Sequence, residues 1–485
     1  MADYPEIRLF IDGKWRSSSE SEPVLDPATE AEIGRYPIAS KDDLADAVAA
    51  ARRGFAVWRA VSPLERQGVM MRAAQILRDR ASEIAHALTL EQGKPLEQSR
   101  LEVLRACDII EWDATEGRRL YGRHIPAEPG MTHIVYREPI GVVAAFSPWN
   151  FPISSPARKV AGALASGCSI ILKASEETPA GAQLLVDAFA QAGLPGGVLN
   201  LVFGHPAEIS AHLISEPDVR LVTFTGSVPV GKALAALCGT HMKPSIMELG
   251  GHCPVIVAGD VDPEWAGHAA AISKSRNAGQ VCVAPTRFYV HRSVHQPFVA
   301  AFARHLEAMS MGPGLDPTAE VGPLANIRRL EAMQLLVDDA VAQGARLVTG
   351  GQRRGNSGYF YPMTILDDVP QSARVMSEEP FGPIAVVQPY DDLADALRRA
   401  NGLSFGLSAY GFTHDADTAA QMAAHLECGN LSINHYVSSV AETPFGGVKD
   451  SGYGREGGIE GLHCYTTVKN VSHLTRPLSL AGTVS

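Results

Sequence analysis

The feature that most restricts the fold of this chain is an alternation of short apolar segments with longer segments whose apolar residues recur at helical spacing. The first series of apolar segments comprises residues 141–147, 169–173, 198–203 and 220–224. A repeated succession of strand, helix and strand indicates a parallel sheet with helices packed on both faces. This part of the chain therefore predicts a doubly wound α/β domain.

A second series of the same kind follows, and its apolar segments are residues 254–258, 286–291, 384–389, 408–413 and 430–434. Two such series predict an α/β fold with two doubly wound domains and a cleft between them. Ligands of open parallel sheets bind beyond the carboxyl ends of the strands. The functional site is therefore expected at such strand ends.

Three stretches lie outside this alternation. Residues 8–15 contain an Asp-Gly pair between apolar residues, which predicts a hairpin. Apolar residues recur at helical spacing from Lys41 to about residue 112, with an interruption at Ser62 and Pro63, so several successive helices are expected. Residues 118–139 read as two polar-edged strands joined by a Pro-Gly turn. Strands that leave a core in this way often pair elsewhere, including with another subunit.

Length and charge exclude several classes of protein. A chain of 485 residues predicts roughly three domains. A net charge of −11, without a run of basic residues, argues against nucleic acid or a membrane surface as a partner. The first residues lack the pattern of a secretory signal and no apolar run is long enough for a membrane span, so we expect a cytoplasmic protein.

Cysteine and histidine spacing gives no sign of a metal site. The seven cysteines form no C-x-x-C pair, which fits reduced thiols in a reducing compartment. The sixteen histidines show no H-E-x-x-H or comparable spacing, so no metal ligand is assigned.

Two glycine-rich stretches resemble phosphate-binding motifs. Gly452 to Gly457 fits G-x-G-x-x-G, but a loop rather than a strand precedes it, so the match is read as accidental. Gly226 to Ala233 follows an apolar strand and opens a helix, and it is one residue short of a P-loop because Ala233 has no hydroxyl for a metal. We prefer a pyrophosphate bound by Ser227 and the helix N-terminus, without hydrolysis. An ordinary capped helix start and a P-loop-type nucleotide hydrolase are the alternatives.

A lysine and a glutamate lie at the carboxyl end of a predicted strand. Lys173 ends the apolar segment 169–173, and Glu176 follows three residues later. A carboxylate beside a ribose accepts hydrogen bonds from its hydroxyls and repels a 2′-phosphate, which favours NAD over NADP as the cofactor. The alternative is that both are solvated loop charges.

Four further residues would together oxidise an aldehyde. A thiolate from Cys282 can add to the carbonyl carbon, after which hydride can leave to a nicotinamide. Asn150, in the stiff sequence Pro-Trp-Asn-Phe-Pro, suits an oxyanion donor, and Glu248, before Gly-Gly, suits a general base. Glu379, close to Phe381, could hold the nicotinamide ribose. Against this, each residue type also has an ordinary structural role, as a core thiol, a packing residue or a surface charge.

At these residues the chain resembles the NAD(P)-dependent aldehyde dehydrogenases, from about residue 8 to about residue 475. Five motifs carry the resemblance, in the order of that family: Pro148-Trp-Asn-Phe-Pro152, Phe224-Thr-Gly-Ser227, Glu248-Leu-Gly-Gly251, Gly279-Gln-Val-Cys282 and Glu379-Pro-Phe-Gly-Pro383. The resemblance implies Cys282 as nucleophile, Asn150 as oxyanion donor and Glu248 as base. It implies that Glu456 lies near the path of the water.

The resemblance also implies cofactor contacts and an assembly. The implied cofactor-binding residues are Ser147, Trp149, Lys173, Glu176, Thr225, Gly226, Ser227, Leu249, Glu379 and Phe381. The implied domains are a cofactor-binding domain of residues 1–118 and 139–249, a catalytic domain of residues 250–462, and an oligomerisation segment of residues 119–138 and 463–485. A homodimer or homotetramer acting on a small-molecule aldehyde is expected.

Within that superfamily the chain is most similar to succinate semialdehyde dehydrogenases. Arg158 and Arg276 match arginines that bind the distal carboxylate of the substrate in those enzymes, and Ser438 or Ser439 matches their substrate-binding serine. The implied substrate is a carboxylate-bearing semialdehyde such as succinate semialdehyde. His435 and Tyr436 depart from the pattern and favour the alternative of a bulkier or aromatic aldehyde.

Overall fold

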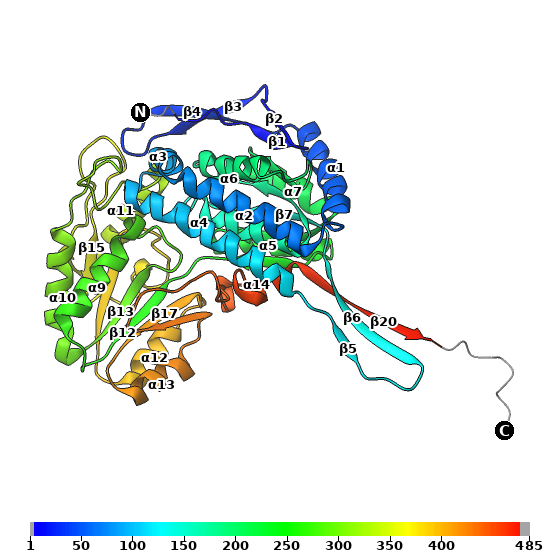
Figure 1. Cartoon of the computed structure of the whole chain (residues 1–485). Helices are drawn as coiled ribbons and strands as arrows, with labels where there is room; N and C mark the ends of the chain where they lie inside the picture. Colours follow the sequence, from blue (N-terminus) through cyan, green and yellow to red (C-terminus); the bar gives the residue numbers. More distant parts are fainter. Residues whose placement is uncertain (1–3, 476–485) are drawn as a thin grey trace.

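The computed structural model describes residues 4–475 and shows two large sheets and one projecting arm (Figure 1). Residues 1–3 and 476–485, at the ends of the predicted cofactor-binding domain and oligomerisation segment, lie outside the described residues. The α/β fold with two doubly wound sheets and a small β extension is confirmed.

The first sheet contains the four strands predicted from the first apolar series. Its strand order is β19-β11-β10-β7-β8-β9-β1-β2, and β11, β10, β7, β8 and β9 run parallel. The bounds are β1 (Leu9–Ile11), β2 (Lys14–Arg16), β7 (Val142–Phe146), β8 (Ser169–Lys173), β9 (Leu199–Val202), β10 (Val219–Thr225), β11 (Ser245–Glu248) and β19 (Gly452–Tyr453). The predicted hairpin at residues 8–15 forms one edge of the sheet as β1 and β2.

Helices cover this sheet on both faces. They are α1 (Lys41–Trp58), α2 (Pro63–Asp79), α3 (Ala81–Gln92), α4 (Leu96–Glu116), α5 (Ser154–Ser166), α6 (Pro179–Gln191), α7 (Pro206–Ser215) and α8 (Val228–Thr240). The interruption predicted at Ser62 is the start of α2, where the Ser62 side chain and Glu65 form a capping box and Pro63 occupies the first turn. Many buried residues of these helices are alanines, which lets the helices approach the sheet closely.

The second sheet has the order β14-β15-β16-β13-β12-β17-β18. Its strands are β12 (Cys253–Val257), β13 (Pro285–His291), β14 (Arg346–Thr349), β15 (Thr364–Asp367), β16 (Ile384–Tyr390), β17 (Ser408–Phe412) and β18 (Asn430–Ile433). Its helices are α9 (Pro263–Ser275), α10 (Arg292–Glu307), α11 (Ile327–Ala342), α12 (Leu393–Asn401) and α13 (Ala416–His425). The five apolar segments of the second series all form strands here. β14 and β15 were not predicted from the sequence.

A three-stranded arm leaves the body of the protein (Figure 1). It consists of β5 (Arg123–Ile125), β6 (Met131–Pro139) and β20 (Thr466–Leu474), all antiparallel, and a short helix α14 (Gly458–Cys464) leads into β20. The two polar strands predicted between residues 118 and 139 are therefore confirmed. A separate hairpin of β3 (Ser21–Leu25) and β4 (Glu32–Pro37) was not predicted.

Residues 4–475 lack two kinds of feature. No helix in this range combines the length and apolar character that a bilayer crossing requires. The same range contains no group of three or more His, Cys, Asp or Glu side chains placed to hold a metal ion.

Candidate active site

The first sheet brings several predicted site residues to one level at its carboxyl edge. Strand register pairs Glu248 with Thr225 and Phe146 with Lys173, so β11, β10, β7 and β8 end side by side. Ser147 follows Phe146 directly, and its N–H donates to the carbonyl of Lys173 at 3.2 Å. Residues that are separated by up to a hundred positions in the chain meet here because parallel strands end at a common edge.

Cys282 lies after a tightly folded turn, η2 (Arg276–Gly279). Asn277 and Ala278 have φ values of 49° and 50°, in the left-handed region that non-glycine residues rarely adopt. Gly279 also has a positive φ, and a Cβ there would lie 2.1 Å from the carbonyl oxygen of Gly382. Backbone strain of this kind persists at functional sites when the surroundings impose it.

Cys282 and Glu248 line the same cavity, which has a volume of about 190 Å³. The cavity is also lined by Thr225, Leu249, Arg158, Arg276, Ser439 and Glu456. Cys282 is partly exposed to it. Burial, with a further contribution from the nearby carboxylates of Glu379 and Glu248, raises the pKa of the Cys282 thiol to about 12. The thiol is therefore protonated at neutral pH and needs a base before it can act as a nucleophile.

Glu248 is buried, and its carboxyl group lacks hydrogen-bond partners in the described part of the chain. Glu248 is 3% exposed, and neither of its carboxylate oxygens has a hydrogen-bond partner among residues 4–475. Burial raises the pKa of Glu248 well above its usual range, and the charge of Glu456 raises it further. A buried carboxyl group without partners and beside a thiol has the properties of a general base or of a site for a water molecule.

A buried ion pair acts electrostatically on Glu248. Lys159 Nζ is 2.7 Å from Oε1 of Glu456 and 3.1 Å from Oγ1 of Thr223. The positive charge of Lys159 opposes the rise in the pKa of Glu248. Glu456 thus pairs with Lys159 and also lines the cavity together with Glu248.

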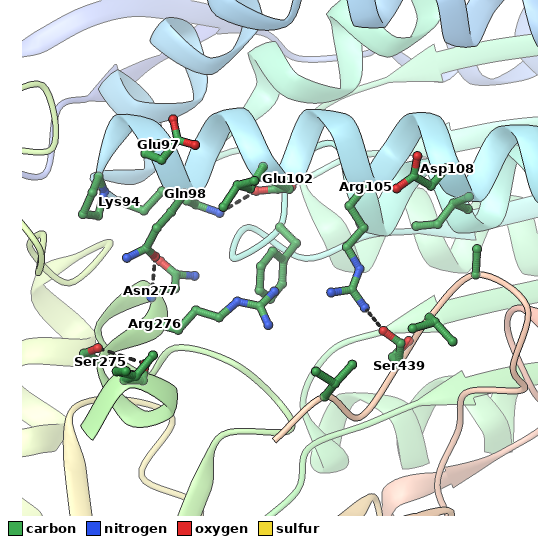
Figure 2. Close-up of a pocket in the computed structure, with 18 of the residues that line it drawn as sticks. Lys94, Glu97, Gln98, Glu102, Arg105, Asp108, Ser275, Arg276, Asn277 and Ser439 are labelled. Atoms are coloured by element: carbon green, nitrogen blue, oxygen red, sulfur yellow. Dashed lines mark hydrogen bonds and ion pairs between the residues drawn. The ribbon is translucent and has the colours of Figure 1, made fainter. Parts of the chain in front are cut away.

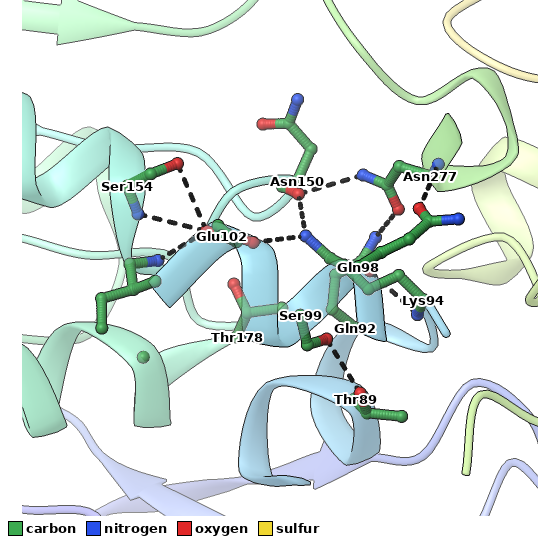
Figure 3. Close-up of polar contacts among 12 residues, drawn as sticks. Thr89, Gln92, Lys94, Gln98, Ser99, Glu102, Asn150, Ser154, Thr178 and Asn277 are labelled. Carbon is green, nitrogen blue, oxygen red and sulfur yellow. Dashed lines mark hydrogen bonds and ion pairs between the residues drawn. The ribbon is translucent and has the colours of Figure 1, made fainter. Parts of the chain in front are cut away.

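Asn150 is fixed beside the Cys282 turn but is not among the residues that line the cavity. Its side-chain Nδ2 donates to the carbonyl of Gln280 at 3.0 Å. The backbone carbonyl oxygen of Asn150 accepts from Lys94 Nζ at 2.8 Å and from Asn277 Nδ2 at 3.0 Å (Figure 3). A side-chain amide has two N–H groups, so one remains for an oxyanion.

A buried ion pair anchors this loop. Lys94 Nζ is 2.6 Å from Oε2 of Glu102, and both side chains are almost fully buried. The other oxygen of Glu102 accepts the backbone N–H groups of Ile153 at 3.0 Å and Ser154 at 3.1 Å (Figure 3). These contacts fix both ends of the loop that carries Asn150.

Glu379 lies over the glycine pair that follows Glu248. Its Oε1 accepts the N–H of Gly251 at 3.0 Å, and a Cβ on Gly250 would lie 2.1 Å from its Oε2. Burial raises the pKa of Glu379 to about 7. Phe381 packs edge to face against Trp149, with ring centroids 5.5 Å apart.

The remaining predicted cofactor residues lie at the carboxyl edge of the first sheet, and of these Thr225 also lines the cavity. Lys173 Nζ is 2.8 Å from Oε2 of Glu176. The hydroxyl groups of Ser147 and Thr225 are buried without a partner among the described residues. Ser227 is the residue before α8, and Gly226 donates its N–H to the carbonyl of Glu248 at 3.1 Å. Free buried hydroxyls at a strand edge fit a polar ligand such as a dinucleotide.

Arg158 and Arg276 both reach the cavity. Arg158 Nη2 donates to Oγ of Ser439 at 2.7 Å, and its Nη1 is buried without a partner among residues 4–475. The guanidinium of Arg158 lies 5.6 Å from the centroid of Phe445, and that of Arg276 lies 5.3 Å from the centroid of Phe151. Both arginines therefore stack on aromatic rings at the cavity wall.

Sequence analysis missed a third arginine. Arg105, on α4, lines the same cavity, and its Nη2 donates to the carbonyl of Ser439 at 2.5 Å (Figure 2). A larger cavity of about 1250 Å³ shares Arg105, Phe151, Arg276 and Ser439 with the smaller one. The sequence does show Arg105 among the apolar residues of a predicted helix. It does not show that this face of the helix is directed at the cavity that contains Cys282.

The sequence pattern described as the aldehyde dehydrogenase family matches residues 15–471. The chain belongs to the aldehyde dehydrogenase family. It is an aldehyde dehydrogenase, and the cofactor of such enzymes is NAD or NADP.

Three known aldehyde dehydrogenases or relatives illustrate the similarity. The chain is 47% identical over 464 residues to a 4-(hydroxymethyl)benzenesulfonate dehydrogenase of Comamonas testosteroni, covering 95% of this chain and 97% of the relative. It is 38% identical over 465 residues to an NADP(+) succinate-semialdehyde dehydrogenase of Escherichia coli K12, covering 95% and 96%. The NAD+ complex of an aldehyde dehydrogenase from Bacillus cereus has a TM-score of 0.95 and 33% identity, covering 97% of each chain.

The alternative of a P-loop-type hydrolase receives no support. Lys232, which such a motif would use on phosphate, lies 2.8 Å from Asp450. Position 233 is alanine and offers no hydroxyl to a metal. The segment from Gly226 to Ala233 is the start of α8 in an aldehyde dehydrogenase.

Proposed function

We propose that this aldehyde dehydrogenase oxidises an aldehyde that carries a distant anionic group, with NAD as the cofactor and through a thioester on Cys282. The observation that carries the proposal is the pair of cations Arg158 and Arg276 on the wall of the cavity that contains Cys282. Within the described part of the chain, neither has a carboxylate within ion-pair distance. An anionic substrate group would supply the missing partner.

The residues of the cavity account for each step of the oxidation. Glu248 takes the proton of Cys282, and the thiolate adds to the aldehyde carbon, so that the carbonyl oxygen becomes an oxyanion. The side-chain N–H of Asn150 and the backbone N–H of Cys282 stabilise that oxyanion. Collapse of the oxyanion re-forms the carbonyl bond, breaks the C–H bond of the former aldehyde and leaves a thioester on Cys282, and a nicotinamide held at the site would supply the acceptor for the hydride. Glu248 then activates water to cleave the thioester, which gives the acid and frees Cys282.

The proton from this water has a route away from the cavity. Glu456 lines the cavity together with Glu248 and is paired with Lys159, and we propose that this ion pair passes the proton on. The overall reaction converts an aldehyde, water and an oxidised cofactor into a carboxylic acid, a reduced cofactor and a proton.

NAD is proposed rather than NADP because of Glu176. The Glu176 carboxylate beside Lys173 would accept hydrogen bonds from the ribose and repel a 2′-phosphate. Ser147, Thr225 and Ser227 supply further polar contacts at the same edge. We include Trp149, Gly226, Leu249, Glu379 and Phe381 in the proposed cofactor site.

Two substrate shapes remain candidates. A linear carboxylate-bearing substrate such as succinate semialdehyde is one. A specific observation favours the other, an aromatic anionic aldehyde, because Phe151, Tyr436 and Phe445 line the cavity. Similarity to a dehydrogenase of 4-(hydroxymethyl)benzenesulfonate supports that second candidate.

The assembly and the domain limits are also proposals. We propose that the arm of β5, β6 and β20 pairs with another subunit in a homodimer or homotetramer, because its strands leave the core and keep exposed apolar side chains such as Val468. Light scattering of the purified protein would give the number of subunits. We retain residues 1–118 and 139–249, 250–462, and 119–138 with 463–485 as the three domains.

A panel of aldehydes tests the proposed function. Reduced cofactor is measured by absorbance with 4-formylbenzenesulfonate, 4-formylbenzoate, succinate semialdehyde, benzaldehyde and butanal, each with NAD and with NADP. We expect kcat/KM to be at least about tenfold higher for the anionic members than for the neutral aldehyde of matching shape. Equal values for charged and neutral aldehydes would remove the proposal.

A further inference from the structure

We infer that Arg105 is a specificity-determining residue, and that Arg105, Arg158 and Arg276 together select a sulfonate as the distal group of the substrate. This inference rests on the proposed function, since it specifies the anion that the same cavity receives. It concerns a residue that the sequence motifs do not include.

The three guanidinium groups come from three separate elements. Arg105 belongs to α4, Arg158 to α5 and Arg276 to η2, and all three line the cavity of about 190 Å³ that contains Cys282. Figure 2 shows the side chains of Arg105 and Arg276 directed into the space between α4 and the loop that carries Ser439. The cations thus approach one space from different directions.

Ser439 joins two of these arginines. Its carbonyl oxygen accepts from Nη2 of Arg105 at 2.5 Å, and its hydroxyl accepts from Nη2 of Arg158 at 2.7 Å. Each guanidinium uses one N–H group in this way and has further donors. The contacts with Ser439 fix the positions of both groups before a ligand arrives, which reduces the entropy lost on binding.

In the described part of the chain the three arginines have no direct acidic partner, although Glu102 is close enough to act electrostatically on Arg105 and Arg276. Over residues 4–475, none of the three arginines forms an ion pair with Asp or Glu. Glu102, one turn before Arg105 on α4, is already bound by Lys94 and by two backbone N–H groups. Burial, and then the charges of Arg158 and Arg276, lower the pKa of Arg105 to about 10, so Arg105 lies within electrostatic reach of both other cations.

The number and direction of these donors fit a sulfonate. A carboxylate has two oxygens in one plane, and one or two guanidinium groups satisfy it by bidentate hydrogen bonds. A sulfonate has three equivalent oxygens directed to three sides, so each oxygen can accept from a different arginine. The rings of Phe151 and Phe445, on which Arg276 and Arg158 stack, provide an apolar wall for the carbon skeleton between the sulfonate and the aldehyde.

The test compares Arg105→Gln with wild type on a matched pair of substrates, 4-formylbenzenesulfonate and 4-formylbenzoate, with benzaldehyde as the neutral reference. The glutamine amide can still donate to the carbonyl of Ser439, so the loop keeps a partner. We expect kcat/KM for the sulfonate to fall by about 10- to 100-fold, mainly through KM, and by less than about threefold for the other two. Arg105→Lys should retain most of the sulfonate activity, because the charge remains.

A control variant separates a local effect from a change in total charge. Arg100→Gln removes a cation from the same helix, but Arg100 is exposed and pairs with Glu97 outside this cavity. It should leave all three kcat/KM values unchanged. Equal losses on all three aldehydes with Arg105→Gln, or no loss on the sulfonate, would overturn the inference.

Failure of the inference is distinguishable from failure of the proposed function. If wild type prefers both anionic aldehydes to benzaldehyde but Arg105→Gln affects sulfonate and carboxylate alike, the role of Arg105 is wrong and the proposed function stands. If wild type does not prefer either anionic aldehyde to benzaldehyde, both the proposed function and the inference about Arg105 are wrong.

Discussion

Lys159 Nζ lies 2.7 Å from Oε1 of Glu456, and both members of this buried ion pair act electrostatically on the unpartnered carboxyl group of Glu248. The two residues are 297 positions apart in the chain. Their charges act on Glu248 in opposite directions, since Glu456 raises its pKa and Lys159 lowers it. Burial makes the largest contribution to the raised pKa of the proposed base, and this pair of residues from distant parts of the chain adjusts it.

The first prediction concerns the pH dependence of kcat. Glu248 acts as a base only when ionised, and burial raises its pKa, so kcat should rise as pH increases through that raised pKa. Glu456→Gln removes the repelling charge and leaves Lys159 to attract Glu248, so the acid limb of the profile should move to lower pH. Steady-state rates between pH 5 and 9 measure this shift. Glu442→Gln, at the larger cavity, should not move the profile, and an unmoved profile with Glu456→Gln would contradict the coupling.

The second prediction concerns the thiol. Because burial raises the pKa of Cys282 to about 12 in the free protein, alkylation by iodoacetamide should accelerate about tenfold per pH unit between pH 7 and 9 without a plateau. Cys282→Ala should abolish formation of the reduced cofactor while cofactor binding, measured by calorimetry, persists. Cys428→Ala is the control and should keep full activity. Turnover by the Cys282→Ala variant would eliminate the thioester route.

The third prediction concerns the arginines that match the family pattern. Arg158→Gln and Arg276→Gln should each lower kcat/KM for succinate semialdehyde by about 10- to 100-fold, because a charge-assisted hydrogen bond is lost. The loss for butanal, a neutral aldehyde of the same length, should be much smaller. Arg292→Gln is the control, because Arg292 is an exposed arginine at the start of α10 that pairs with Asp391. Equal losses on both aldehydes would show that these arginines act only on the fold.

The fourth prediction concerns cofactor choice. Glu176→Gln removes the charge that repels a 2′-phosphate and releases Lys173 from its ion pair. We expect kcat/KM for NADP to rise by about tenfold while that for NAD falls. Glu208→Gln, on α7, should change neither value. A variant that still discriminates between NAD and NADP as wild type does would show that other residues decide the preference.

The fifth prediction concerns stability. Glu102→Gln leaves Lys94 buried without its anion and should lower the free energy of unfolding by about 3–5 kcal/mol. Glu97→Gln, on the same helix, breaks only an exposed pair with Arg100 and should cost less than about 1 kcal/mol. Urea denaturation followed by circular dichroism measures both variants. Similar losses in the two variants would contradict the anchoring role of Glu102.

Local patterns in the sequence were sufficient for much of the fold. The nine apolar segments of the two series are strands in the structure, and α2 begins at the predicted interruption next to Ser62. These features depend on residues close together in the chain, through side-chain periodicity and capping. β14, β15 and the hairpin of β3 and β4 were missed because they lack a long apolar run and owe their position to a neighbouring strand or to an exposed edge.

The sequence by itself determined the fold class, the family and the short motifs around Cys282, Glu248 and Asn150, because motif order and strand periodicity are written along the chain. Only the tertiary structure decided that Arg105 from α4 faces Arg158 and Arg276, and that Lys159 pairs with Glu456 behind the base. The direction of a helix face and the meeting of distant strand ends follow from how the two sheets and their helices pack. No spacing between neighbouring residues encodes that packing.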